Sequence, residues 1–451
     1  MRFNSIAIAV AVMLGVIQSG CRKEADFVDK EKVSTSATER PSYHDGNNSA
    51  IIQTWYSTAL QLVKETPGHT PPIVARSLGY MGVTLYQAVL PGMEYNPRSL
   101  VGQLNGLSSL PARAHEGQYS ESIIANAALA RIVKSLFANA SAANVLKIDS
   151  IESAIKLQYS THLNASALNR SVDYGHSIAD AVFNWSTTDG GYQAYLNNFP
   201  SGYIPPAGPG YWLPTAAFQK AMLPYWGSNR TFVPADGPGP IDPPAPLAFS
   251  PENNSAFYSE AMLVYNTVNN LTAEQRMIAN YWADGGSTFT PPGHNIAIVL
   301  QVIRNSNLNL FQASELLAKV GIGLNDAGII CWRCKFRTNL LRPVSYINTY
   351  ISPSWTSLIP TPPFPSYTSG HASFSGVTSQ LLTYKFGDNF SFTDSAKIAY
   401  GFAPRSFNSF NNAADEAAIS RLYGGIHYSF DNDNGKACGK LIAENIARLN
   451  W

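Results

Sequence analysis

The sequence predicts an all-α protein, and three observations support this prediction. Apolar residues recur at three- and four-residue spacing over many segments, the period-2 alternation of strands is nearly absent, and helix-start signals precede several segments. Thr272 and Gln275 form a capping-box pattern, and Pro71 and Pro72 stand at a predicted helix start. We therefore expect antiparallel helices in bundle packing.

Residues 190–251 lack the helical spacing that is found on both sides of them. This region is rich in Pro and Gly and carries interspersed aromatic residues, so we expect an irregular stretch that wraps over the helices. It would separate an N-terminal helical half, 48–189, from a C-terminal half, 252–451. The predicted helices are 51–63, 72–89, 120–137, 143–162, 166–185, 255–269, 272–284, 294–305, 310–337, 371–386 and 435–449.

Composition indicates an ordered globular protein with a neutral overall charge. Of 451 residues, 45% are hydrophobic and 12% aromatic, which is enough to build a large core. The formal net charge of +1 argues against nucleic acid or an anionic membrane surface as the main partner. Clustered basic residues in this chain therefore serve a local purpose.

The N-terminus is typical of an export signal. Arg2 provides a positive charge and residues 6–17 form an apolar run that is too short to span a bilayer as a mature helix. The run ends in QSGC, which resembles a bacterial lipoprotein box with Cys21 as the lipidated residue. We expect a signal peptide at 1–20, a solvated tether at 21–47, and a location in the bacterial cell envelope. The protein would be lipid-anchored at Cys21 or, alternatively, periplasmic or secreted.

The four cysteines do not form a disulfide framework. If Cys21 is lipidated, the odd number that remains, Cys331, Cys334 and Cys438, excludes complete pairing. Cys331 and Cys334 have the C-x-x-C spacing of redox and zinc sites but lack the surrounding sequence of either. Packing thiols or a local bridge are the favoured interpretations.

Lys335 and Arg342 form the first of three polar clusters in the C-terminal half. They are seven residues apart, about two helical turns, so on a continuous helix they would project from the same face. Pro343 would stop that helix. Taken alone, the pair is better explained as two solvated charges.

Ser369, Gly370 and His371 form the second cluster, between a Pro-rich approach at 360–365 and a helical segment. Backbone N–H groups at such a helix N-terminus favour an anion, and Gly370 allows a ligand to approach the backbone. Taken alone, this tripeptide is better explained as an ordinary helix cap.

Arg421, His427 and Asp431 form the third cluster. If this stretch is helical, His427 and Asp431 are neighbours on one face, and the carboxylate can orient the imidazole ring. Gly424 and Gly425 indicate a bend between them and the arginine. Taken alone, His427 is better explained as a structural histidine with satisfied hydrogen bonds.

Together the clusters give K-x6-R-P, S-G-H and S-R-x5-H-x3-D, in this order and with each internal spacing intact. They resemble the superfamily of type 2 phosphatidic acid phosphatases, bacterial acid phosphatases and vanadium-dependent haloperoxidases. The resemblance is strongest over 272–431 and implies paired four-helix bundles. Thr368 departs from the family pattern, which usually has Pro before Ser-Gly-His.

The resemblance leaves two activities open, because the same cage of cations holds phosphate or vanadate. In the phosphatase interpretation, His427 attacks phosphorus and forms a phosphohistidine, and His371 protonates the leaving oxygen. Lys335, Arg342 and Arg421 stabilise the transition-state charge. The substrate would be a soluble phosphate ester in preference to a lipid phosphate.

In the haloperoxidase interpretation, the cofactor is vanadate, with phosphate as a competing occupant, and His427 is the metal ligand. His371 acts as acid–base when hydrogen peroxide binds, and Lys335 polarises the peroxide so that a halide can attack it. The resemblance implies that the vanadate oxygens are held by Lys335, Arg342, Arg421, Ser369 and the Gly370 N–H.

Three features favour the haloperoxidases over the phosphatases. The long N-terminal helical half resembles theirs, and Trp332 and Phe364 fall where they carry an aromatic wall, although core packing alone can explain both residues. The sequence YWADG, followed by TPPGH, resembles a family segment whose Asp, here Asp284, pairs with the second active-site Arg, here Arg421. His294 matches no ligand position and is treated as structural.

The resemblance therefore implies a haloperoxidase that oxidises a halide with hydrogen peroxide to hypohalous acid. Similarity to enzymes of bacterial envelopes favours iodide, then bromide, with chloride last. A surface lipoprotein that binds an oxyanion without turnover is a third interpretation. The sequence makes no prediction of oligomeric state.

Overall fold

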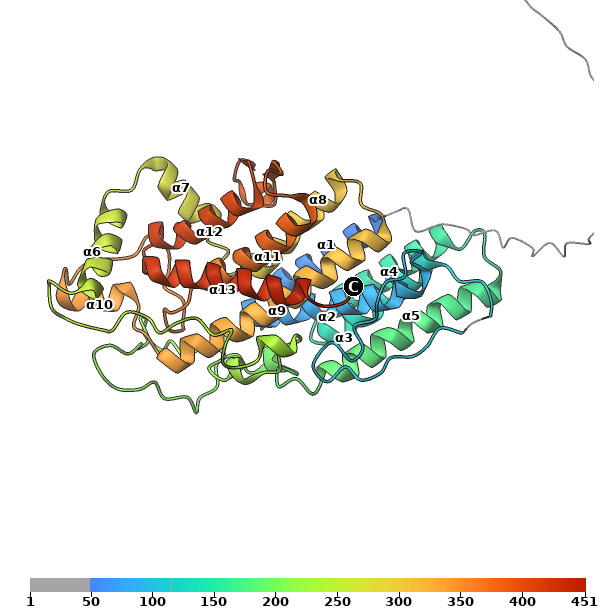
Figure 1. Ribbon diagram of the computed structural model, residues 1–451, viewed down its shortest axis with the longest axis horizontal. Coiled ribbons are helices and arrows are strands. Elements are labelled where there is room, and N and C mark those ends of the chain that lie inside the picture. The colour runs from blue at the N-terminus through green and yellow to red at the C-terminus, as the bar shows by residue number, and fades with distance from the viewer. Residues whose placement is uncertain (1–48, 115) are drawn as a thin grey trace, which may run out of the picture. The chain divides into compact units, whose positions relative to one another are not determined.

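The computed structural model describes residues 49–114 and 116–451, which fold into thirteen α-helices, short 3-10 helices and one two-stranded sheet (Figure 1). The predicted all-α class is confirmed. These residues belong to one compact unit. None of the described helices has the length and hydropathy that crossing a bilayer requires. The predicted signal peptide, the tether and Cys21 lie outside the described residues.

Each predicted helix overlaps one of the observed helices. The two strands are β1 (Phe392–Asp394) and β2 (Arg405–Phe407), which pair antiparallel. The α-helices are α1 (Ala50–Glu65), α2 (Pro71–Val89), α3 (Glu121–Leu136), α4 (Ala142–Tyr159), α5 (Ala165–Ser186), α6 (Ala256–Asn269), α7 (Ala273–Tyr281), α8 (Thr290–Asn305), α9 (Leu310–Thr338), α10 (Pro343–Tyr350), α11 (Gly370–Phe386), α12 (Phe410–Tyr423) and α13 (Ser429–Ala447). The 3-10 helices are η2 (Leu90–Gly92), η3 (Ala194–Leu196), η4 (Trp226–Ser228), η5 (Pro234–Asp236) and η6 (Ile398–Tyr400).

Helices α2 and α9 form the centre of the core and join the two predicted halves (Figure 1). They approach so closely that a Cβ at Gly321 would lie 2.7 Å from the Leu78 carbonyl oxygen, and one at Gly79 would lie 2.9 Å from the Gly321 oxygen. Only glycine permits such an approach. Because α9 also packs on α11 and α13, this pair fixes the helix that carries Lys335 against those that carry the other clusters.

The segment 190–251 contains only η3, η4 and η5 as helical turns. Trp212 N donates to Asn339 O at 2.6 Å, and Met222 N donates to Pro363 O at 2.9 Å. The segment therefore lies over the C-terminal end of α9 and over the loop that leads to α11. The domain limits given above remain predictions.

The continuous helix expected between Lys335 and Arg342 is wrong. Helix α9 ends at Thr338, because Asn339 adopts the left-handed conformation with φ of 46°. Pro343 does not stop a helix: it begins α10, where a first-turn proline loses no hydrogen bond. Lys335 and Arg342 therefore reach the site from two separate elements.

Helices α10 and α12 and the sheet were not predicted. The buried residues of α12 include Ala413, Ala414, Ala417 and Ala418. These small side chains replace the large apolar residues by which a helix is usually detected in a sequence. The strands have only three residues each, too few for an alternating pattern to be visible.

Candidate oxyanion site

The three predicted clusters come together at one place in the fold. Lys335 lies in the last turn of α9, Arg342 is the N-cap of α10, and Arg421 lies in the last turn of α12. These three cations are at most 1% exposed. Ser369 is the N-cap of α11, as predicted, and its Oγ accepts from Ala372 N at 3.5 Å.

Lys335 is held by the loop before α11. Its Nζ donates to Pro365 O at 3.0 Å, Ser366 O at 2.8 Å and Thr368 O at 2.5 Å. Thr368, the departure from the family pattern, thus contributes through its backbone carbonyl, which any residue at this position would provide. Burial lowers the pKa of Lys335 to about 7, so the ammonium gains much from a nearby anion.

Arg342 lies against His427. Its Nε donates to Phe364 O at 2.9 Å, its Nη1 donates to Ile426 O at 2.7 Å, and Nη1 is 3.2 Å from His427 Nε2. Nη2 is buried and has no partner. Burial lowers the pKa of Arg342 to about 10. An unpartnered donor on a buried cation favours an anionic ligand.

His427 is oriented by Asp431, as the spacing predicted, but not along a helix face. His427 precedes α13, and Asp431 lies in its first turn. The distance from His427 Nδ1 to Asp431 Oδ2 is 2.8 Å, and Ser366 Oγ donates to the same oxygen at 2.5 Å. Ser369 N donates to Asp431 O at 3.0 Å. Asp431 therefore ties His427 to the N-terminus of α11.

Arg421 and His371 form the other side of the site. Arg421 Nη1 is 3.2 Å from His371 Nε2, and its Nη2 donates to Ala279 O at 3.2 Å. Burial, followed by the Arg421 charge, keeps the pKa of His371 well below its usual range. The His371 side chain is 16% exposed, whereas that of His427 is 3% exposed. Solvent therefore reaches His371 more easily.

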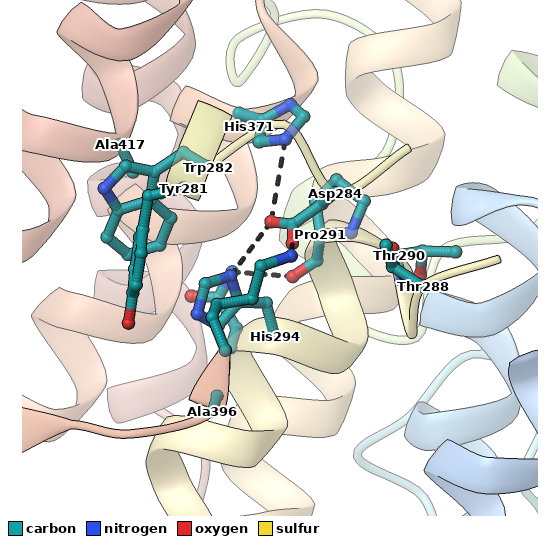
Figure 2. Close-up of polar contacts among 12 residues, drawn as sticks. Tyr281, Trp282, Asp284, Thr288, Thr290, Pro291, His294, His371, Ala396 and Ala417 are labelled. Atoms are coloured by element: carbon teal, nitrogen blue, oxygen red, sulfur yellow. Dashed lines mark hydrogen bonds and ion pairs between the residues drawn. The ribbon is translucent and has the colours of Figure 1, made fainter. Parts of the chain in front are cut away.

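The predicted pairing of Asp284 with Arg421 takes the form of a charge interaction. No direct ion pair joins the two residues among those that the structure describes, but the Asp284 charge offsets part of the lowering of the Arg421 pKa by burial. Asp284 Oδ2 is 2.9 Å from His294 Nδ1 and 3.8 Å from His371 Nε2, and its Oδ1 accepts from Lys397 Nζ at 2.7 Å (Figure 2). Arg421 makes its direct contacts with the Ala279 carbonyl, with His371 and with Ser420 Oγ, to which its Nε donates at 3.1 Å. Asp284 still supports the site, but it does so through the histidine.

Sequence reasoning missed Lys397 and Asp394, and it set His294 aside as structural. His294 is fully buried, and its Nε2 is 2.8 Å from Asp394 Oδ2. No motif marks Lys397 or Asp394. The only available signal is that His294 lies ten residues after Asp284, with α8 beginning between them.

Trp332 and Phe364, the residues of the expected aromatic wall, lie together beside two of the cations and belong to a buried apolar cluster. Their ring centroids are 4.9 Å apart, and Lys335 Nζ and Arg342 Cζ each lie 5.0 Å from the Phe364 centroid. Trp332 Nε1 donates to Met222 O at 3.2 Å. The irregular segment therefore supports this wall from outside.

The cysteines near the wall are free thiols. Cys331, Cys334 and Cys438 are buried and unpaired in the described part of the chain. Cys331 Sγ donates to Thr368 O at 3.4 Å, the carbonyl that also accepts from Lys335. Cys331 therefore acts as a packing thiol beside the site.

The donor set fits a tetrahedral oxyanion such as vanadate. Three buried cations face the N-terminus of α11, where backbone N–H groups favour negative charge. The orphaned Arg342 Nη2 provides a ready donor. With Nδ1 directed at Asp431, His427 Nε2 keeps a lone pair for one bond to the central atom.

Comparison with known proteins agrees with this chemistry. The described site lies largely within residues 315–450, which match a family model described as the second helical-bundle domain of VCPO. The crystal structure of the first bacterial vanadium-dependent iodoperoxidase is similar at a TM-score of 0.81 and 32% identity, covering 88% of this chain and 95% of that one. The chain belongs to the vanadium haloperoxidase family.

More distant members of the vanadium haloperoxidase family share the fold. A holo-type bacterial vanadium-dependent chloroperoxidase aligns at a TM-score of 0.62 and 19% identity, over 87% of this chain and 97% of that one. Vanadium chloroperoxidase from Curvularia inaequalis is 28% identical over 204 residues, or 38% of this chain. This match spans only a third of that relative's length.

Proposed function

We propose that the protein is a vanadate-dependent haloperoxidase that uses hydrogen peroxide to oxidise a halide to hypohalous acid. The observation that carries the proposal is the buried cage of Lys335, Arg342 and Arg421 around a histidine whose Nδ1 is committed to a carboxylate. Family membership supports the same chemistry. The similarity to an iodoperoxidase favours iodide, then bromide.

The protein's first task is to hold vanadate and leave it reactive. Bound vanadate would supply a Lewis-acidic centre that activates hydrogen peroxide. His427 would provide the metal ligand at Nε2, because Asp431 occupies its Nδ1. The vanadate oxygens would be held by Lys335, Arg342, Arg421, Ser369 and the Gly370 N–H.

The second task is proton transfer at His371. Its Nε2 lies between the Arg421 Nη1 donor and the Asp284 carboxylate. The neutral ring accepts from Arg421, and Asp284, at 3.8 Å, can stabilise the charge of the protonated ring. His371 can therefore take a proton from incoming hydrogen peroxide and return it to a leaving oxygen.

The third task is polarisation of the oxygen that the halide attacks, which we assign to Lys335. Its ammonium lies beside the Trp332 and Phe364 rings. Aromatic rings around a cation exclude water and strengthen its electrostatic effect. The two rings would also offer a polarisable surface to a large halide.

The proposal is tested by iodide oxidation with hydrogen peroxide, before and after orthovanadate is added to protein freed of vanadate by chelator and of phosphate by dialysis. Activity that requires vanadate and is suppressed by phosphate is expected. A phosphate ester is tested in parallel. Ester hydrolysis inhibited by vanadate, without peroxidase turnover, would instead establish the alternative, a phosphatase that forms a phosphohistidine on His427.

Phosphate or vanadate binding without either activity would identify an oxyanion-binding protein. Bromide and chloride in the same assay test the halide order. Export to the bacterial envelope, with Cys21 as a lipid anchor or with a free periplasmic or secreted form, remains a prediction from the sequence.

A further inference from the structure

A cluster of four charged side chains lies next to His371, and Figure 2 shows two of them, Asp284 and His294, beside it. Asp284 follows α7, His294 is on α8, Asp394 ends β1, and Lys397 comes shortly after it. These four residues are at most 5% exposed. The cluster is linked by contacts of 2.7 to 2.9 Å, from His294 to both carboxylates and from Lys397 to Asp284. It is therefore one hydrogen-bonded unit.

The contacts of His294 favour a ring that carries two protons. Each ring nitrogen faces a carboxylate oxygen, Nδ1 at Asp284 and Nε2 at Asp394. A neutral imidazole would direct one lone pair at a carboxylate, which is repulsive. Although burial disfavours the cation, the two carboxylates raise the pKa of His294 to about 9. With Lys397, the cluster then holds two negative and two positive charges, which allows its burial.

One oxygen of Asp284 is shared between two histidines. Oδ2 is 2.9 Å from His294 Nδ1 and 3.8 Å from His371 Nε2. Arg421 Nη1 is 3.2 Å from the same His371 nitrogen. A proton on His371 Nε2 is therefore attracted by Asp284 and repelled by Arg421. The charges of His294 and Lys397 also disfavour it and lower the pKa of His371.

We propose that His294 is a positioning residue that acts on His371 through Asp284. It fixes the Asp284 carboxylate and takes up part of the hydrogen-bonding capacity of Oδ2. The negative charge of Asp284 raises the pKa of His371. By sharing that charge, His294 makes the rise smaller, so that His371 can release its proton. Lys397 has the same influence on the pKa of His371 through its contact with the other oxygen of Asp284, Oδ1. The proposal relies on the proposed function only for what His371 does with its proton.

The orientation of His294 is fixed from outside the cluster. Its ring stacks on Trp282, with centroids 4.7 Å apart and an angle of 27°. Asp394 Oδ1 accepts from Ala396 N at 2.9 Å, and Asp394 Oδ2 accepts from the Tyr281 hydroxyl at 2.7 Å. The ring therefore has one orientation in which both nitrogens are satisfied, as a positioning residue requires.

The test is the pKa of His371, measured by imidazole NMR in full-length protein freed of vanadate. Its signal, one of eight histidines, is assigned with His371→Gln. Asp284→Asn removes the nearest anion and is expected to lower this pKa by about one pH unit. His294→Gln removes a cation that contacts Asp284 Oδ2, and this change is expected to raise the His371 pKa by about the same amount. A general loosening of the structure would not give opposite signs.

The double variant Asp284→Asn/His294→Gln tests whether His294 acts through Asp284. The His371 pKa of this double variant is expected to be near that of Asp284→Asn alone. Without the Asp284 carboxylate, His294 and His371 no longer share a partner through which one could affect the other. If the double variant instead has the His371 pKa of the unmodified protein, the two shifts have cancelled. This result would show that His294 acts directly on His371 and would overturn the proposal.

Lys397→Met is a second route to the same result if His294→Gln does not fold. It is expected to raise the His371 pKa, and Lys397→Arg is expected to restore it. His176→Gln is the matched control: it removes a half-exposed histidine that contacts Glu152 at 3.4 Å, and it should leave the His371 pKa unchanged.

Two further results would overturn the proposal. One is a shift of the His371 pKa in the same direction in Asp284→Asn and His294→Gln. The other is an unchanged pKa in folded His294→Gln. Because these measurements use protein without vanadate, their failure would leave the proposed haloperoxidase activity untouched, and failure of that activity would leave them valid.

Discussion

The two histidines of the site each have a carboxylate beside them, but at different ring nitrogens. Asp431 contacts Nδ1 of His427, so Nε2 keeps its lone pair, which faces Arg342 Nη1 at 3.2 Å. Asp284 approaches Nε2 of His371, the nitrogen that also faces Arg421. The first carboxylate fixes a tautomer and directs a lone pair at a ligand. The second acts on the proton itself.

The two carboxylates also differ in their partners, which are neutral donors for Asp431 and cations for Asp284. Asp431 accepts from the neutral donors Ser366 Oγ and Tyr428 N, and burial raises its pKa to about 6. Asp284 is just as deeply buried, but His294 and Lys397 hold its pKa below the usual range. One histidine is thus prepared for bonding and the other for proton transfer, although both belong to the same site.

His427→Ala is expected to have the largest effect. It removes the only proposed bond to vanadium, so iodide oxidation should fall by more than about 100-fold, beyond the loss expected for a supporting residue. Steady-state assays at saturating orthovanadate measure this loss. Activity near that of the unmodified protein would show that His427 is not the ligand.

His371→Ala is expected to lower kcat by about 10²- to 10⁴-fold, the usual contribution of general acid–base catalysis. The concentration of vanadate that gives half-maximal activity should change little. A large change in that concentration with a small change in kcat would assign His371 to vanadate binding and remove the contrast between the two histidines.

Asp431→Asn is expected to weaken vanadate binding by about 10- to 100-fold, because the neutral amide oxygen is a weaker acceptor than the carboxylate for His427 Nδ1–H. Isothermal titration with orthovanadate measures the affinity. Asp415→Asn, which removes an exposed carboxylate paired with Lys436, is the control. Equal affinities in the two variants would show that His427 needs no orientation by Asp431.

The pH dependence of oxyanion binding is expected to be the smallest effect. Without an anion, burial lowers the pKa of Lys335 to about 7, so above this pH the free site increasingly holds a neutral amine. A bound anion favours the ammonium and raises the pKa. Affinity for sulfate should therefore be highest below pH 7 and fall by up to about tenfold per pH unit above it.

Lys335→Arg provides the check on this pH dependence. An arginine stays charged throughout the range, so the decline in sulfate affinity just above pH 7 should flatten. Titrations at pH 6, 7, 8 and 9 compare the two proteins. Parallel curves would show that another group controls the decline.

Much of the fold could be predicted, because most helices bury large apolar residues at regular spacing. Helix α12 could not, since its buried face is built from alanines such as Ala413 and Ala417. The break between α9 and α10 depends on one left-handed residue, Asn339, which local spacing does not reveal.

The motif residues of the site could be predicted because each cluster has short internal spacing. The partner of Asp284 could not, since Lys397 is more than a hundred residues away and the contact depends on where α8 and β1 lie. A conserved spacing is not needed for such a contact. Charge pairs between distant segments are set by packing, and a single sequence carries no local sign of them.

The measurement that tests the account most directly is the amount of vanadium retained per chain after gel filtration, compared for His427→Ala, His371→Ala and the unmodified protein. The account predicts about one vanadium per chain in the unmodified protein and in His371→Ala, and none in His427→Ala. Retention by His427→Ala, or loss from both variants, would contradict the division of roles between the two histidines.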